Sequence, residues 1–215
     1  MTKRLAFAGL LMAMTLLGPA AAAADTLTFN GLGKGLGLNV TFGSTTENVW
    51  VGEIKWNESS FGAIVTYCVD LFDPALWTET VTVRTTTALN STNSAGVLDG
   101  AGGQAAWLFN NFRAEASADN TKAAALQLAI WQALYGQSFV SVTNSTVMNL
   151  AASYLNQMGN QTSVATYLDV DNISSTGHGQ DQIATPEPAT LFLLTLGAGA
   201  ALGYKRRHPK RQRAE

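Results

Sequence analysis

The stretch Ala123-Ala-Ala-Leu-Gln-Leu-Ala-Ile-Trp-Gln-Ala-Leu-Tyr135 decides the fold of this chain. Apart from its two glutamines it is apolar on every side, which predicts a helix buried on most of its surface. Gln132 lies about 140° from Gln127 around such a helix and can face solvent. Gln127 shares a face with Ile130 and Trp131, where burying its amide costs about 1–3 kcal/mol unless the amide finds partners. The amide therefore either bonds a neighbouring backbone or is chemically consumed.

Two more helices flank this one. The spacing of apolar residues predicts helices over 104–116, 121–135 and 145–158. Asn120 or Thr121 is expected to cap the start of the second helix, and Gly136 follows its end. Gly159 is expected to close the third.

Strands are predicted before the glycine-rich break at 96–103. From Thr26 to about Leu89 apolar residues recur at every second position between turn-forming residues, as in a β-meander or half of a sandwich. One last strand is expected over 163–170. Strands followed by helices indicate an α+β fold, with an N-terminal antiparallel sheet or sandwich, a three-helix segment and a final strand.

The N-terminus has the order of a secretory signal. Lys3 and Arg4 precede the apolar run 5–17, which is followed by small residues up to Ala24. We expect signal peptidase to remove residues 1–24, so that the body begins at Asp25. A retained membrane anchor is the alternative, although the apolar run is short for a span.

The C-terminus carries an apolar run followed by a basic cluster. Pro186, Glu187 and Pro188 precede the uncharged segment 189–204, and this predicted transmembrane helix would rise about 24 Å against a hydrocarbon core of about 30 Å. A helix of this length can insert into a membrane, but it is only marginally long enough. The basic stop at the membrane consists of Lys205, Arg206 and Arg207. Because basic residues stay in the cytoplasm, the body is expected on the periplasmic side of the inner membrane.

This ending resembles the PEP-CTERM sorting signal of Gram-negative bacteria. The resemblance covers 186–215 and implies an exosortase as partner, a membrane protease-transpeptidase that is thought to cut near the Pro-Glu-Pro motif. The membrane anchor would then be transient, and the mature protein would reach the cell surface or the extracellular matrix of a biofilm. A plain C-terminal anchor has the same topology and differs only in keeping its tail. Residues 171–185 are expected to form a polar linker that spaces the body from the membrane.

Composition excludes several classes of function. The chain is 47% hydrophobic and 13% charged, too apolar for a disordered tail. Its formal net charge of −2 hides an acidic body, because 25–187 holds 14 acidic residues and five basic ones. Such a body does not fit nucleic acid as a partner. The two histidines, His178 and His208, lie in the linker and the tail. We therefore expect no enzyme, no metal site and no cofactor.

Cys68 is the one cysteine of the chain. In an exported protein a single cysteine suggests an intermolecular disulfide or a reactive thiol. Alternate residues from Phe61 to Leu71 form an apolar strand face, so Cys68 should point the other way, beside Thr66 and Asp70. If both faces of the sheet are covered, Cys68 can still be a small core residue.

Two short motifs resemble those of bacterial surface thioester domains. They are Tyr67-Cys68-Val69-Asp70 on a strand and Leu126-Gln127-Leu128-Ala129-Ile130-Trp131 on a later helix. The resemblance implies a thioester-like domain over 25–170, in which the sulfur of Cys68 and the side chain of Gln127 condense with loss of ammonia. A nucleophile, typically a Lys amine on a partner, would attack the Gln127 carbonyl and displace Cys68 as a thiolate.

Four residues would surround this bond. Tyr67 and Trp131 are expected to slow its hydrolysis by limiting water, and Asp70 and Ile130 are their neighbours in the two motifs. The resemblance departs from the family in one respect, because thioester domains are best known from Gram-positive adhesins whereas the sorting signal here is of Gram-negative type. The two resulting hypotheses are covalent adhesion through Cys68 and Gln127, and a non-reactive structural or exopolysaccharide-associated module of the biofilm matrix.

Overall fold

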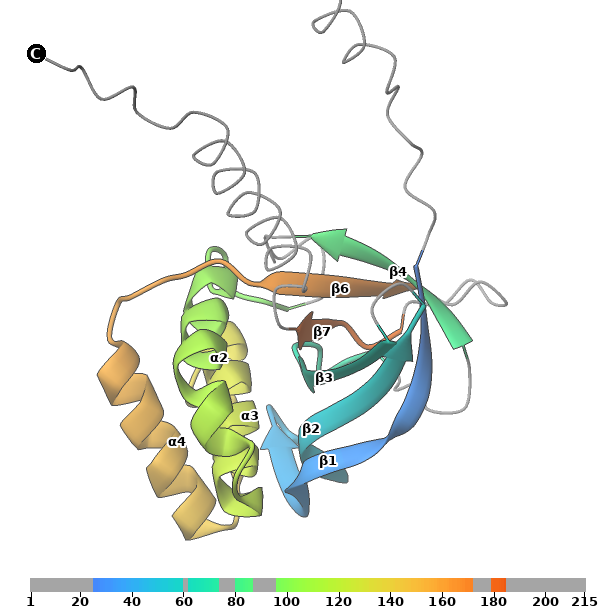
Figure 1. The fold of residues 1–215 in the computed structure, drawn as a ribbon. Coiled ribbons are helices and arrows are strands. Elements are labelled where there is room, and N and C mark those ends of the chain that lie inside the picture. The colour runs from blue at the N-terminus through green and yellow to red at the C-terminus, as the bar shows by residue number, and fades with distance from the viewer. Residues whose placement is uncertain (1–24, 60–61, 74–79, 87–95, 172–178, 185–215) are drawn as a thin grey trace, which may run out of the picture.

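The computed structural model describes residues 25–59, 62–73, 80–86, 96–171 and 179–184. Within these ranges three helices lie along one side of the strands (Figure 1). In chain order the elements are β1 (Asp25–Phe42), β2 (Thr45–Glu58), β3 (Gly62–Cys68), β4 (Thr80–Thr86), α2 (Gly102–Ala116), α3 (Asn120–Tyr135), β5 (Val140–Val142), α4 (Ser145–Met158), β6 (Thr166–Asp171) and β7 (Gln182–Ala184). The α+β architecture expected from the sequence is confirmed.

All strand pairs of the sheet are antiparallel. The strand order is β2-β3-β7-β6-β4-β1-β5, and a further pairing joins β1 to β2. Six strands therefore close into a ring, and β5 pairs with the end of β1. The expected alternative of a sandwich half is wrong, because one sheet curls back on itself instead of facing a second sheet.

Strand β1 makes this closure possible by bending. Its register against β2 shifts between Phe29 and Gly31 and again between Leu32 and Gly35, as β-bulges do. Gly52 of β2 faces the second shift with φ +146°, and a Cβ there would collide with the backbone of Lys34 and Gly35. Only glycine allows the two backbones to approach so closely.

The expectation that residues 171–185 form a polar linker is wrong for the part that forms strand β7. Residues 171–185 are too polar for a core element by composition, yet Gln182–Ala184 pair with β3 on one side and β6 on the other. All three residues are buried. The described part of this segment thus belongs to the body of the domain, since a strand between two neighbours satisfies its backbone groups whatever its side chains.

Helix α3 is the centre of the core. Every residue from Ala123 to Tyr135 is buried, because α3 packs against β1 and β2 as well as α2 and α4. The solvent-facing position expected for Gln132 is therefore wrong. Its side chain is 5% exposed and donates from Nε2 to the carbonyl oxygen of Val140 over 2.8 Å. The short strand β5, which the sequence pattern did not reveal, brings this acceptor to the helix.

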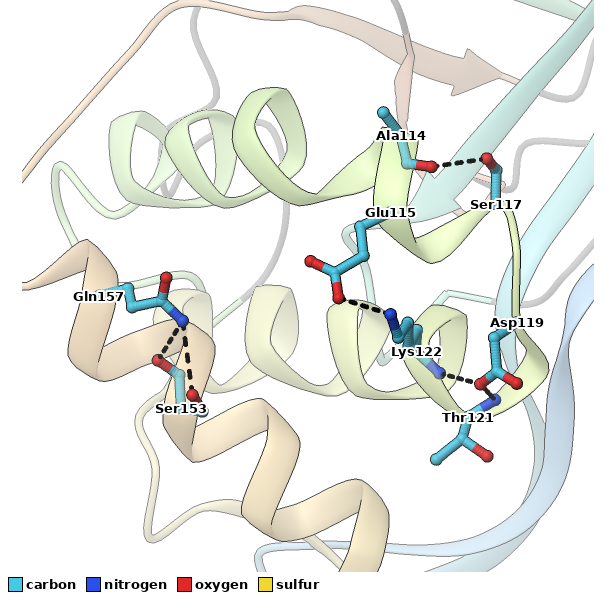
Figure 2. A network of polar contacts seen from close by, with 8 residues as sticks. All are labelled: Ala114, Glu115, Ser117, Asp119, Thr121, Lys122, Ser153 and Gln157. Carbon is cyan, nitrogen blue, oxygen red and sulfur yellow. Dashed lines mark hydrogen bonds and ion pairs between the residues drawn. The ribbon is translucent and has the colours of Figure 1, made fainter.

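The cap of α3 also differs from the expectation. Asp119, not Asn120 or Thr121, accepts hydrogen bonds from the backbone N–H groups of Thr121 and Lys122 at 2.8 and 3.0 Å (Figure 2). Lys122 pairs with Glu115 at the end of α2 over 2.7 Å. Gly136 and Gly159 follow the ends of α3 and α4 as predicted.

The predicted signal peptide at 1–24, the sorting signal at 186–215 and its helix at 189–204 lie outside the described residues. In the ranges that the structure describes, no helix has the length and apolarity needed to cross a membrane.

Candidate functional site

Gln127 of α3 reaches the backbone of Cys68 at the end of β3. Its Oε1 accepts a hydrogen bond from the Cys68 N–H over 3.0 Å, and its Nε2 donates to the Cys68 carbonyl oxygen over 2.7 Å. Both residues are buried, with exposed fractions of 1% and 3%. The two motifs that the sequence singled out thus meet side by side, although 58 residues separate them in the chain.

The Cys68 thiol lies in a site covered on both sides. Thr66, Tyr67 and Cys68 are all buried, so the end of β3 has no solvent-facing side. The sulfur Sγ donates to the carbonyl oxygen of Asp70 over 2.6 Å. Burial raises the pKa of the thiol well above its usual value, and the nearby negative charge of Asp70 adds to this effect. The thiol is therefore protonated at neutral pH.

Asp70 is a fully buried carboxyl group beside this thiol. Its Oδ1 accepts from the backbone N–H groups of Phe72 and Asp73 at 2.9 and 3.4 Å, whereas no donor among the described residues reaches Oδ2. Burial, with Asp73 and Asp181 close by, raises the pKa of Asp70 to about 7. This carboxyl group can therefore gain or lose a proton near neutral pH.

A cleft with a volume of about 630 Å³ leads to Cys68 from the surface. Cys68 and Trp131 line it together with a group of mostly aromatic and apolar side chains, and with the acidic residues Glu47 and Asp73. The remaining lining residues are Phe29, Leu32, Val40, Phe42, Asn48, Val49, Trp50, Ile54, Leu71, Phe72 and Gln180. No lysine or arginine of the described residues lines this cleft.

The other predicted neighbours lie in different places. Trp131 lines the cleft together with Cys68. Tyr67 does not line it, because alternate residues of a strand point to opposite faces. The Tyr67 ring instead packs edge-on against Phe109 of α2, with 6.0 Å between the centroids. Ile130 is fully buried in α3.

Two residues near the thiol escaped the sequence analysis. Gln180 donates from Nε2 to the Asp70 carbonyl oxygen over 3.0 Å, so this oxygen accepts both the thiol and an amide. The hydroxyl of Tyr135 donates to the Val69 carbonyl oxygen over 3.1 Å and accepts from the Leu71 N–H over 3.3 Å. Tyr135 is the last residue of α3, and the sequence signal for it was a polar hydroxyl at the end of a helix expected to be buried. Gln180 lies in a polar run too short to show any periodicity.

The predicted sorting residues are placed by comparison with known proteins. Pro186, Glu187 and Pro188, with the basic stop at Lys205, Arg206 and Arg207, lie outside the described residues. Residues 184–207 match the family model of the PEP-CTERM protein-sorting motif. The sorting part of the resemblance is confirmed, and the chain is an exported protein that is handled at the membrane as an exosortase substrate. No curated protein matches the sequence.

Two solved structures that match this chain at low similarity are thioester domains of other proteins. One is the N-terminal thioester domain of a surface protein from Clostridium perfringens, with 10% identity, a TM-score of 0.43, and coverage of 63% of this chain and 88% of that chain. Another is the N-terminal thioester domain of the fibronectin-binding protein SfbI from Streptococcus pyogenes. It has 12% identity and a TM-score of 0.44, and the match covers 78% of this chain and 95% of that chain.

Proposed function

We propose that this chain is a surface or matrix protein that attaches covalently to a partner through an internal thioester between Cys68 and Gln127. Export and handling at the membrane follow from the sorting motif at 184–207. The observation that carries the covalent step is the pair of hydrogen bonds that holds the Gln127 amide against the backbone of Cys68. This arrangement supports the proposal, because it holds the acyl group of Gln127 against the residue that carries the thiol.

Bond formation needs an attack of Sγ on the side-chain carbonyl carbon of Gln127. The S–C bond forms, the C–N bond breaks, and the thiol proton leaves with the nitrogen as ammonia, without any change of oxidation state. Negative charge develops on Oε1 during the attack. This oxygen already accepts the Cys68 N–H over 3.0 Å, so the backbone supplies the stabilising donor.

Proton transfer at the site falls to Asp70. Because the Cys68 thiol is protonated at neutral pH, its attack on Gln127 requires a base, and its departure as a leaving group requires an acid. Asp70, whose pKa lies at about 7, is poised for both directions and is close enough to raise the pKa of the thiol. During bond formation it would take the proton from the sulfur and pass it to the leaving nitrogen, and during attachment it would pass a proton from the attacking amine to the sulfur.

Attachment consumes the bond once. A primary amine of the partner enters the cleft, its nitrogen bonds to the Gln127 carbonyl carbon, and Cys68 leaves as a thiol, so that an amide links the two proteins. Trp131 lies beside Cys68 in the cleft lining and keeps water from the bond until the partner arrives. The protein therefore acts without turnover, as an adhesive and not as an enzyme.

Intact-mass measurement of the purified full chain tests this function. A chain that carries the bond weighs one ammonia less than its sequence, and methylamine adds to Gln127. The Cys68→Ala variant should show neither change. Freshly purified chain of full sequence mass whose Cys68 alkylates freely would exclude the thioester.

One observation favours the alternative, a non-reactive matrix module. The Gln127 amide has one acceptor and one donor in the Cys68 backbone, so its burial is compensated without any covalent chemistry. The aromatic lining of the cleft, which includes Trp50, Phe29 and Phe72, would then stack on sugar rings of an exopolysaccharide. Binding of matrix polysaccharide to a Cys68→Ala chain, with no covalent adduct in the unchanged chain, would support this function.

A further inference from the structure

The segment 179–184 connects the buried thiol with the sorting signal. Its last three residues are β7, which pairs directly with the strand that carries the cysteine: Gln182 lies opposite Cys68 and Ala184 opposite Thr66. The match to the sorting motif starts at Ala184. The chain therefore passes from the reactive site into its sorting signal without an intervening spacer.

Hydrogen bonds tie this segment to the backbone around the thiol. The Val69 N–H donates to the Asp181 carbonyl oxygen over 2.9 Å, and Gln180 donates to the Asp70 carbonyl oxygen over 3.0 Å. The first contact is made by the residue directly after Cys68, and the second uses the same carbonyl oxygen that accepts the hydrogen bond of the Cys68 thiol. The segment thus holds the loop that follows Cys68 from two sides.

A chain of buried side chains fixes Gln180 in turn. Trp56 donates from Nε1 to the Thr66 hydroxyl over 3.0 Å, and that hydroxyl donates to Oε1 of Gln182, also over 3.0 Å. Nε2 of Gln182 donates to the Gln180 carbonyl oxygen over 2.9 Å. Because every donor in this series has its acceptor, Gln180 has little freedom to move away from Asp70.

We propose that the segment 179–184 positions the Cys68 thiol for reaction with Gln127, and that Gln180 is the positioning residue that orients the acceptor of the thiol, the Asp70 carbonyl oxygen. The inference rests on the proposed function, since orientation of the thiol has a chemical consequence only if the thiol reacts. Formation of the thioester then requires that β7 has docked, and so depends on the same stretch of chain that leads into the sorting signal.

Two substitutions in the full chain test this role. Gln180→Ala removes the amide, whereas Gln180→Glu keeps its shape and replaces the donor with an acceptor. Gln157→Ala is the matched control, because Gln157 is exposed on α4 and bonds only Ser153 of the same helix (Figure 2). Loss of one net hydrogen bond should slow the reaction about 2- to 10-fold in both Gln180 variants.

The measurements are the fraction of chain that lacks one ammonia and the rate of methylamine uptake, taken where thermal unfolding shows all variants to be folded. Gln180→Glu separates positioning from packing: a residue that only fills space is replaced well by glutamate, whereas a residue needed as a donor is not. Equal rates in wild type and Gln180→Ala, or normal rates in Gln180→Glu, would overturn the inference while leaving the thioester in place.

A wild-type chain of full sequence mass would refute the proposed function and move the test to the free thiol. The rate of Cys68 alkylation by iodoacetamide then reports its orientation. Positioning by Gln180 predicts faster alkylation in Gln180→Ala than in Gln157→Ala, because the loop that holds the thiol is loosened. Identical alkylation rates would overturn the positioning role.

Discussion

Gln127 holds the backbone of Cys68 with both ends of its side-chain amide, over 3.0 Å through Oε1 and 2.7 Å through Nε2. These two bonds join the most buried helix to the strand that carries the one cysteine of the chain. A primary amide in this place is needed whether or not it reacts, since each of its ends satisfies a buried backbone group.

Gln127→Glu should abolish the loss of ammonia and destabilise the fold. The carboxyl group cannot donate to the Cys68 carbonyl oxygen, and its charge is buried, so the free energy of unfolding should fall by about 1–3 kcal/mol or more. Chemical denaturation and intact mass measure the two effects. The matched control is Gln132→Glu, which loses the donor to Val140 at a similar cost but should keep the mass deficit. A mass deficit that persists in Gln127→Glu would place the acyl group elsewhere.

Asp70 should make the folded state less stable as pH rises. Its pKa is about 7 in the folded chain against an ordinary value of 3.8, so between these pH values the folded state holds a proton that the unfolded state has released. The free energy of unfolding must then fall from pH 4 to pH 7 and change little above that through this group. Asp70→Asn removes this contribution. Melting temperatures of both chains across this range test the effect, and parallel curves would contradict it.

Trp131→Phe should shorten the lifetime of the thioester in water. The smaller ring leaves room beside Cys68 in the cleft, so water reaches the bond more easily. The rate at which the ammonia-deficient chain gains the mass of one water measures hydrolysis. Tyr67→Phe is the control and should leave that rate unchanged, because Tyr67 lies on the other face of β3 against α2. Faster hydrolysis in Tyr67→Phe alone would contradict this prediction, because it would assign the shielding to the face of β3 that packs against α2.

Asp119→Ala should cost about 1 kcal/mol of stability. Its carboxylate accepts the free N–H groups of the second and third residues of α3, Thr121 and Lys122, and loss of such an N-cap typically costs about 0.5–2 kcal/mol. Asn120→Ala, one position further, should have almost no effect since Asn120 is exposed and does not cap the helix. Urea unfolding of the two variants gives the comparison. The reverse order of stabilities would restore Asn120 as the cap.

Deletion of Pro186 to Pro188 should leave the protein in the inner membrane. The apolar segment and its basic stop would still insert, but exosortase would lack the motif within the matched sorting signal. Fractionation of cells into membrane and medium measures the outcome. Since Ala184 ends β7, the deletion begins after the described fold and should leave the domain intact. Unchanged release from the membrane would argue against exosortase handling.

Local patterns in the sequence were enough for much of the fold. The three helices were found almost residue for residue because their apolar spacing and closing glycines are local features. The sorting motif was readable for the same reason. The cap at Asp119 and the burial of Gln132 were missed, since both depend on which neighbour reaches the residue.

The sequence by itself determined the three helices, the sorting motif and the two residues, Cys68 and Gln127, that form the candidate site, because periodicity and motifs act over a few residues. The tertiary structure decided the rest: that Gln127 meets Cys68, that Tyr67 faces away from the cleft, and that Gln182 lies opposite Cys68 in the sheet. A strand such as β7 gains its stability from backbone bonds to β3 and β6, which are distant in sequence. Its own polar residues therefore carry no signal of it, and only the closed sheet shows that the path to the sorting motif runs past the thiol.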